Sequence, residues 1–375
     1  MAHRGNAIGK DVCCIDDLKR LGSGRLNQTV RDYYNGGAMD LISLQDNEAA
    51  FDRYKLRPRV LINVEKVDTE TEILGTKVSL PFGFGPTASH KLAHPEGEMA
   101  TSRAAAKFGI CMCLSSYSTY PLEDVIKEEN GNPYAIQMCV LRDRSITLQL
   151  LERAEKAGYK ALFLSVDVPV LGHRLNEYRN DFRIPADMSY PNILSYGSDQ
   201  SSRTEYDPRL DWESALPWLR KHTSMKIWLK GIMAPEDVEL AIRHGADGVI
   251  ISNHGGRQLD GVPSTLDALR SCAPVAKGKI PIAIDGGIRR GSDIFKALAL
   301  GAVFCFLGRI PIWGLAYNGQ EGVELALKIL QLELKVTMAL AGKSKNATCL
   351  YYGRTGNWPS SNDQELLEEL LISKL

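Results

Sequence analysis

The sequence predicts an α/β protein, a (β/α)8 or TIM barrel, and three observations lead to this fold class. Eight short apolar runs follow residue 80, and each is separated from the next by a polar tip and a helical pattern. The runs are apolar without alternation, which indicates strands buried on both faces of a parallel sheet. No antiparallel break interrupts them, so we expect a closed barrel rather than its rival, a doubly wound open sheet.

The strands are expected in chain order at residues 81–85, 110–114, 134–138, 161–166, 226–229, 248–251, 280–284 and 303–307. A helix over 144–157 places Ile146, Leu150 and Ala154 on one stripe. A second helix over 234–244 begins with Pro235-Glu236-Asp237 and ends before Gly245, because proline suits the first turn and glycine the end of a helix.

Three further segments surround these repeats. Residues 1–80 are predicted to form a helical extension packed on the barrel, and this extension covers the lower end of the barrel or contributes a lid. The barrel itself is expected to span residues 81–345. The long insertion at about 181–211 follows the fourth strand and predicts a lid over the active face. Residues 346–375 predict a tail that ends in Ser373-Lys374-Leu375, the address read by the peroxisomal import receptor, so we expect a peroxisomal location.

Composition excludes several classes of function. The 375 residues contain 45 Lys plus Arg and 45 Asp plus Glu, so no global field recruits nucleic acid or an anionic membrane. No transmembrane run is present, and the first ten residues lack the apolar centre of a signal peptide. The eight cysteines have no zinc spacing, so we expect no metal and a reducing compartment.

The most informative stretch is residues 252–260, Ser-Asn-His-Gly-Gly-Arg-Gln-Leu-Asp, directly after an apolar run. Two glycines allow a tight bend behind His254, and Arg257 returns to the same side three residues later. Histidine can accept a proton and arginine can clamp a carboxylate. A plain surface turn is the alternative, and the polar ends of the neighbouring strands argue against it.

All eight expected strands end in polar side chains, and five of these ends carry charge. Because chemistry in a barrel collects at the carboxyl ends of the strands, we expect the site there. The end residues are Thr87, Ser115, Gln137, Ser165 with Asp167, Lys230, Asn253 with His254, Asp285 and Arg309.

The last two strand ends predict a phosphate site. Gly286-Gly287 and Gly308 let backbone N–H groups approach a phosphate, and Arg289 and Arg309 supply positive charge. A single phosphate fits flavin mononucleotide (FMN). Residues 83–88 match the dinucleotide pattern G-x-G-x-x-A, but Pro86 interrupts it and no helix starts until about residue 94, so we do not expect NAD.

Together these motifs resemble the FMN-dependent 2-hydroxy-acid oxidases, the family of glycolate oxidase, long-chain hydroxy-acid oxidase and lactate oxidase. The resemblance covers essentially the whole chain, and residues 252–260 match the family signature almost residue for residue. Other matches are Arg31-Asp32-Tyr33-Tyr34, Pro86-Thr87-Ala88, residues 93–98 and Leu307-Gly308-Arg309. The resemblance implies an FMN enzyme that oxidises a 2-hydroxy acid to the 2-oxo acid, passes the electrons to O2 to give H2O2, and forms a homotetramer.

The resemblance also implies a role for each matching residue. In the catalytic group, His254 is the base, Asp167 its partner, Lys230 the cation at the pyrimidine edge of the flavin, and Tyr33 a further contact. The substrate group comprises Arg257, Arg174, Tyr33, Tyr117 and Cys139. The FMN group comprises Thr87, Ala88, Ser115, Gln137, Ser165, Lys230, Ser252, Asp285, Gly287, Arg289, Gly308 and Arg309.

One departure from the family pattern concerns the substrate. Cys139 stands where the oxidases usually have a tyrosine whose hydroxyl points at the substrate, and His173 replaces the usual arginine before Arg174. A thiol is a shorter and poorer hydrogen-bond donor than a phenol. An alternative function is therefore open, an FMN oxidoreductase for a larger or unusual carboxylate, by oxidative decarboxylation or biosynthetic tailoring. A flavin-binding protein without turnover is a third interpretation, which is disfavoured by the joint presence of His254, Asp167, Arg257 and Lys230.

Overall fold

The computed structural model describes residues 11–193 and 205–344, together with the backbone of Tyr351–Tyr352. Residues 194–204 of the predicted insertion lie outside the described residues. The same holds for the rest of the predicted tail, including Ser373-Lys374-Leu375.

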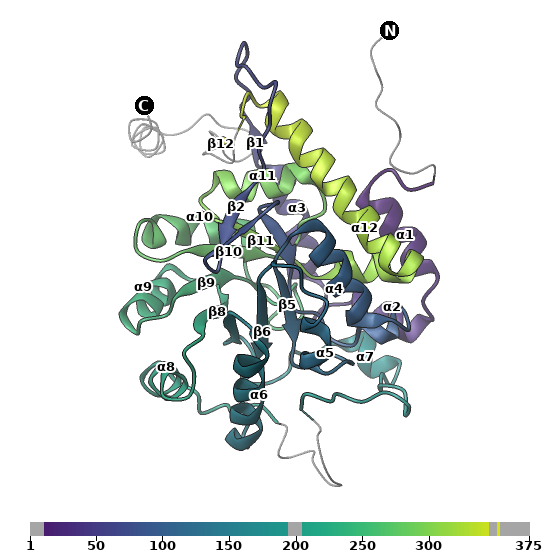
Figure 1. Ribbon diagram of the computed structural model, residues 1–375, viewed down its shortest axis with the longest axis vertical. Coiled ribbons are helices and arrows are strands. Elements are labelled where there is room, and N and C mark those ends of the chain that lie inside the picture. The colour runs from purple at the N-terminus through teal and green to yellow at the C-terminus, as the bar shows by residue number, and fades with distance from the viewer. Residues whose placement is uncertain (1–10, 194–204, 345–350, 353–375) are drawn as a thin grey trace.

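Eight parallel strands close into one barrel in the order β10-β11-β4-β5-β6-β7-β8-β9, which confirms the predicted fold (Figure 1). In parallel sheets closed this way, all carboxyl ends meet at one rim. The strands are β4 Phe82–Phe84, β5 Met112–Ser115, β6 Tyr134–Met138, β7 Ala161–Ser165, β8 Lys226–Ile232, β9 Gly248–Ile251, β10 Ile282–Asp285 and β11 Phe304–Leu307.

The strand boundaries differ from the predicted ones for local reasons. β10 begins at Ile282, two residues late, and β4 at Phe82, one residue late. Each start follows a proline, which has no N–H for the ladder. β8 runs three residues further than predicted, with an irregular register between Lys230 and Ile232.

The helices around and beyond the barrel are α1 Ile15–Gly24, α2 Gln28–Asn35, α3 Ile42–Arg53, the 3-10 turn His90–Leu92, α4 Gly97–Phe108, α5 Leu122–Ile126, α6 Arg144–Ala157, α7 Leu175–Arg179, α8 Trp212–Arg220, α9 Pro235–Arg243, α10 Thr265–Ala276, α11 Gly291–Ala299 and α12 Arg309–Leu340. The predicted helix 144–157 is α6, with Leu150 and Ala154 buried and Ile146 half-buried. The predicted helix 234–244 is α9, one residue shorter at each end.

Residues before the barrel contact it at both ends. Near the carboxyl-end rim, the backbone N–H of Ala38 donates to the carbonyl of Gly256 at 2.8 Å, and Asp260 accepts from the N–H of Ser43 at 2.8 Å. At the opposite end lies a hairpin of β2 Thr71–Ile73 and β3 Thr76–Val78, and α1 packs along α12 (Figure 1). A short antiparallel pair of β1 Lys55–Leu56 and β12 Tyr351–Tyr352 completes the strands.

The barrel interior is an apolar core rather than a channel. Side chains from the hairpin and from the strands form one buried cluster, which includes Ile73, Leu74, Val78, Phe163, Trp228 and Phe306. Cys111 and Cys113, expected as core thiols, are buried in the same cluster. This packing leaves the strand ends at the rim as the part of the barrel open to chemistry.

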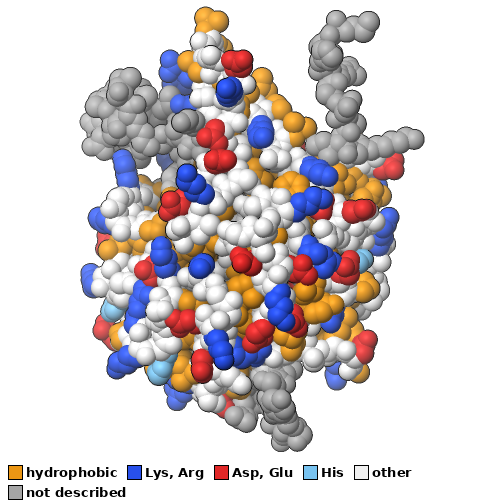
Figure 2. Space-filling model, viewed as in Figure 1, with side chains coloured by type: hydrophobic (Ala, Val, Ile, Leu, Met, Phe, Trp, Pro, Cys, Tyr) orange, Lys and Arg blue, Asp and Glu red, His pale blue; other side chains and the backbone are white. Residues whose placement is uncertain are grey.

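The surface carries both signs of charge. Figure 2 shows Lys, Arg, Asp and Glu side chains interspersed over one face of the molecule. Among the described helices, none combines the length and the apolar character needed to cross a bilayer.

Candidate active site

Four neutral polar side chains stand at the ends of neighbouring strands, and we call Thr87, Ser115, Gln137 and Ser165 the neutral arc. The parallel register sets Ser115 beside Gln137. The Ser115 hydroxyl donates to Gln137 Oε1 at 3.4 Å, and Gln137 Nε2 donates to Ser165 Oγ at 3.0 Å. Thr87 Oγ1 donates to the Gly308 carbonyl at 3.0 Å, which joins the first strand to the last.

The remaining four strand ends carry titratable groups, and we call Lys230, His254, Asp285 and Arg309 the charged arc. Lys230 Nζ donates to Ser252 Oγ at 2.9 Å and lies 3.2 Å from Asp285 Oδ2. Burial acts to lower the pKa of Lys230, but Asp285 and Asp167 outweigh it and the pKa is raised. Lys230 is therefore a fixed positive charge at the rim.

His254 is held by Asp167, which follows β7. The Nδ1 atom lies 3.2 and 3.1 Å from the two carboxylate oxygens. Desolvation lowers the pKa of His254 and outweighs the opposing effect of Asp167, so the ring is neutral and ready to accept a proton. The pKa of Asp167, which burial would raise, is lowered because His254 and Lys230 favour the carboxylate.

Backbone geometry fixes this pair. His254 has φ 57°, in the left-handed region that non-glycine residues seldom adopt. Gly231 has φ 110°, and a Cβ there would come within 2.5 Å of Asp167 Cγ. Glycine is thus required in β8 for the Asp167 side chain to reach His254.

Two arginines stand together beside Tyr33. Arg257 lies over the Tyr33 ring at 4.9 Å from its centroid and donates to the Tyr33 carbonyl. Arg174 Nε donates to the Arg257 carbonyl at 3.1 Å. Both guanidinium groups share Glu177, at 3.0 Å from Arg257 and 3.4 Å from Arg174. The shared carboxylate aligns the two predicted substrate clamps.

Tyr117 and Cys139 lie next to the neutral arc. The Tyr117 N–H donates to Ser115 Oγ at 3.1 Å, and Gln137 Nε2 lies 3.6 Å from Cys139 Sγ. Cys139 is 8% exposed, and burial raises its pKa to about 12. The thiol therefore stays protonated and unreactive near neutral pH. The ring of His173 is stacked on Tyr178.

The residues of the predicted phosphate seat fit an anionic group such as the phosphate of FMN. Arg309 donates to the carbonyls of Tyr34, Gly36 and Gly255 at 2.8, 2.8 and 3.0 Å. Desolvation, followed by repulsion from Arg257 and Arg289, lowers the pKa of Arg309 to about 9. Such a crowded set of cations gains from a bound anion.

Nearby polar atoms also lack partners. Asp285 Oδ1 and Arg289 Nε are buried and have no hydrogen-bond partner within the described part of the chain. Arg289 otherwise pairs with Glu48 at 2.6 Å. Next to it, a Cβ on Gly287 would meet the Asn47 carbonyl at 1.9 Å, so that glycine is needed for α3 to pack.

The N-terminal segment supports the rim through Asn47, which the sequence did not single out. Asn47 and Asn253 exchange amide hydrogen bonds at 2.8 and 2.9 Å, and Asn47 Oδ1 also accepts from the Thr265 N–H at 3.1 Å. These bonds fix the loop that carries His254. Other groups missed at the sequence level are Glu48, Glu177, Tyr190, Tyr206 and Gly231. None of these residues stands in a recognisable sequence motif. The predicted site contains several arginines without an assigned carboxylate partner, and this was the one signal that could have suggested Glu48 and Glu177.

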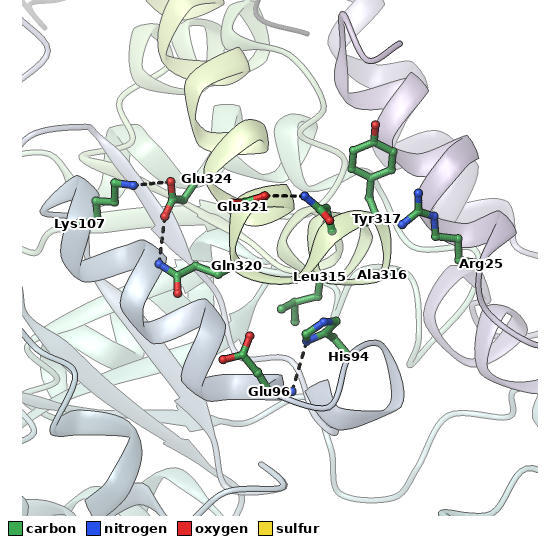
Figure 3. Close-up of a pocket in the computed structure, with 12 residues that line it drawn as sticks. Arg25, His94, Glu96, Lys107, Leu315, Ala316, Tyr317, Gln320, Glu321 and Glu324 are labelled. Atoms are coloured by element: carbon green, nitrogen blue, oxygen red, sulfur yellow. Dashed lines mark hydrogen bonds and ion pairs between the residues drawn. The ribbon is translucent and has the colours of Figure 1, made fainter. Parts of the chain in front are cut away.

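A separate surface pocket lies where α12 bends at Asn318 and Gly319. Figure 3 shows His94 and Glu96 facing residues of α12, with Lys107 bound to Glu324 at 2.6 Å. None of the predicted site residues lines this pocket. Among the described residues, no group of three or more His, Cys, Asp or Glu side chains could hold a metal ion.

A closed parallel barrel with a neutral arc, a charged arc and a cationic seat is an arrangement suited to a flavin-dependent oxidoreductase of the barrel class. Comparison with known families agrees. Residues 22–350 match the FMN-dependent dehydrogenase family, and the chain belongs to it. It is thus an FMN-dependent enzyme of the hydroxy-acid oxidase group, as its relatives also indicate.

Three relatives illustrate the range of similarity. Oxidase FUB9 of Fusarium oxysporum f. sp. lycopersici is 52% identical over 343 residues, 89% of each chain. Human 2-hydroxyacid oxidase 1 is 42% identical over 345 residues, 88% of this chain and 93% of the relative. The structure of mandelate oxidase with benzoyl-formic acid superposes with a TM-score of 0.83 at 37% identity, covering 89% of this chain and 95% of that one.

Proposed function

We propose that the rim oxidises a 2-hydroxy acid to the 2-oxo acid with His254 as the base. The observation that carries the proposal is the placement of His254, held at 3.1 Å by Asp167, beside the paired guanidinium groups of Arg257 and Arg174. A base and a carboxylate clamp at one site suit a substrate that carries a hydroxyl next to a carboxylate.

Each side chain then has a defined task. Arg257 and Arg174 bind the substrate carboxylate, and Tyr33 supports Arg257 through its ring. His254 accepts the proton of the substrate, and Asp167 stabilises the imidazolium that results. The oxidation releases two electrons and two protons, and bound FMN would supply the acceptor for the electron pair and for the proton that His254 does not take. Lys230 supplies positive charge at the rim, where negative charge develops.

The neutral arc and the cationic seat are proposed to hold the cofactor. Thr87, Ser115, Gln137 and Ser165 offer hydroxyl and amide groups, and Ala88 and Ser252 belong to the same predicted set. Asp285, Gly287, Arg289, Gly308 and Arg309 surround the expected phosphate position.

The test is to mix the oxidised flavoprotein anaerobically with a panel of 2-hydroxy acids and to follow loss of the oxidised flavin absorption. Rapid bleaching by at least one acid is expected. A yellow protein that no 2-hydroxy acid reduces would overturn the proposal and favour a binding protein without turnover.

Three finer predictions accompany the proposal. Dioxygen is the final electron acceptor, so one 2-hydroxy acid and one O2 give one 2-oxo acid and one H2O2, which a peroxide assay measures. We also expect the protein to form a homotetramer, and light scattering tests this by measuring its mass in solution. The peroxisomal location stays a prediction from Ser373-Lys374-Leu375, which removal of these residues from a tagged protein tests.

A second candidate substrate is a larger carboxylate, and Cys139 favours it. The side chain is buried at the end of β6, where a cysteine leaves more space than a tyrosine. Each added methylene in an apolar pocket contributes about 1–3 kcal/mol, so we expect 2-hydroxyoctanoate to have a higher kcat/KM than lactate, and lactate than glycolate. Cys139→Tyr should shift the preference back toward small acids. Preference of the parent enzyme for glycolate would contradict this proposal.

A further inference from the structure

The segment around Tyr206 is joined to the strand end that carries Cys139. Leu141 and Tyr206 form an antiparallel bridge. The Arg142 N–H donates to the Glu205 carbonyl at 2.8 Å, and the Asp207 N–H donates to the Val140 carbonyl at 2.9 Å. The backbone therefore places Tyr206 across from the residues that directly follow β6.

The register of this pairing is fixed by Asp207. Its side chain is fully buried and accepts from Arg209 Nε at 2.8 Å, from the Arg209 N–H at 3.1 Å and from Arg144 at 3.4 Å. Hydrogen bonds from Arg209 lower the pKa of Asp207 to about 2, so the anchor stays charged over the working pH range. Of these bonds, the one to Arg144 reaches the chain after β6, so a slip by one residue would break it and turn Tyr206 to the other face.

The Tyr206 side chain faces the predicted substrate pocket. It interacts with Tyr117 and, electrostatically, with Cys139 and Arg174, all three of which are predicted substrate residues. Tyr117 packs edge-on against Tyr190 with ring centroids 5.3 Å apart. Tyr206 thus connects the neutral arc side of the pocket with a predicted carboxylate clamp.

The two phenols remain protonated. Burial raises the pKa of Tyr117 to about 12 and raises that of Tyr206 further from its usual value. A neutral phenol is a good hydrogen-bond donor, whereas the buried thiol of Cys139 is a weak one. The donor at this part of the pocket is therefore a phenol from the opposite segment.

We propose that Tyr206 is a substrate-positioning residue whose hydroxyl supplies the donor that Cys139, at the end of β6, does not provide. The inference rests on the proposed function, because it assumes that the substrate carboxylate lies at Arg174 and Arg257. Tyr117, which interacts with Tyr206, is the neighbour on the side of the neutral arc. Substrate selection then depends on a tyrosine carried by the segment paired with residues 140–142.

The first experiment compares Tyr206→Phe with the parent holoenzyme. The variant keeps the ring and loses the hydroxyl. Anaerobic mixing with 2-hydroxyoctanoate gives the flavin reduction rate and the apparent Kd, and we expect their ratio to fall about tenfold, as for loss of one hydrogen bond to substrate. FMN content and Tm should not change. Tyr178→Phe, at an exposed tyrosine stacked on His173, is the matched control and should behave like the parent.

The second experiment repeats the change in a Cys139→Tyr background. If a phenol on β6 restores the donor, Tyr206→Phe should then cost less than about twofold, which is the coupling expected of two residues that share one task. Each oxidised enzyme is also titrated with 2-oxooctanoate, and the shift of the flavin spectrum gives its Kd. These Kd values measure the coupling between the two residues in binding alone, without turnover.

The outcomes are distinguishable. An unchanged ratio in Tyr206→Phe, or an equal loss in both backgrounds, overturns the inference and leaves the proposed function intact. Loss of FMN or a lower Tm in both backgrounds makes Tyr206 structural and also overturns it. A parent enzyme that no 2-hydroxy acid reduces overturns the proposed function itself.

Discussion

The neutral arc and the charged arc occupy two halves of one rim, yet their side chains are stabilised differently. Gln137 in the neutral arc bonds Ser115 and Ser165 through an uncharged amide. Lys230 in the charged arc depends on Asp285, and His254 depends on Asp167. The comparison shows that the hydrogen bonds of the neutral arc do not depend on protonation state, whereas Lys230 and His254 depend on charged partners.

The largest expected effect lies in the charged arc. His254→Ala removes the proposed base, so the rate of flavin reduction should fall by about 10²–10⁴-fold while FMN stays bound. Anaerobic stopped-flow absorbance measures the rate. His222→Ala, at an exposed histidine, is the control. A variant that reduced its flavin at the parent rate would make His254 a structural residue and erase the difference between the arcs.

Asp167→Asn tests how far His254 depends on its carboxylate partner. Loss of a charge-assisted hydrogen bond should lower the maximal reduction rate by about 10–100-fold. Asp167 raises the pKa of His254, so its removal lowers that pKa further. Because the base acts when neutral, the acid limb of the pH–rate profile should move to lower pH. A limb that stayed in place would mean that another group sets it.

Arg257→Lys sharpens the comparison on the substrate side. A point charge cannot reproduce a bidentate fork, so the KM for the acid should rise about tenfold to a hundredfold, with a smaller effect on the rate at saturation. Steady-state kinetics measure both the KM and the rate at saturation. Arg183→Lys, at an exposed arginine, should leave KM unchanged. An unchanged KM in Arg257→Lys would place the carboxylate elsewhere.

The smallest effect is expected in the neutral arc. Gln137→Ala removes neutral hydrogen bonds of about 0.5–1.5 kcal/mol each, so FMN affinity should fall about tenfold or less at every pH. Quenching of FMN fluorescence gives the Kd, and the exposed Gln149→Ala serves as control. A pH-dependent loss, or a rate loss that excess FMN does not restore, would show that the two arcs are not separate.

The fold and the strand ends were predictable from the sequence because their signals are local. Continuous apolar runs indicated buried strands, and the switch to Thr87, Gln137 or His254 marked where each strand ends. The parallel register then brings these ends together without further information.

The supporting groups were not predictable in this way. Glu177 and Tyr206 reach the rim through tertiary contacts, and neither stands in a periodic pattern. The hairpin at residues 71–78 turns at Leu74-Gly75 with φ 56° and 79°. Leucine seldom adopts that conformation, so the usual Asn-Gly turn signal is absent and the hairpin was not predicted.

That hairpin has a kinetic consequence. Leu74 and Val78 fill the amino end of the barrel against Trp228 and Phe163, so in the described part of the chain no passage runs through the interior. We therefore expect the proposed substrate to enter, and its product to leave, on the rim side of the barrel. Because the 2-oxo acid would occupy the same place as the 2-hydroxy acid, we expect release of the product to precede binding of the next substrate.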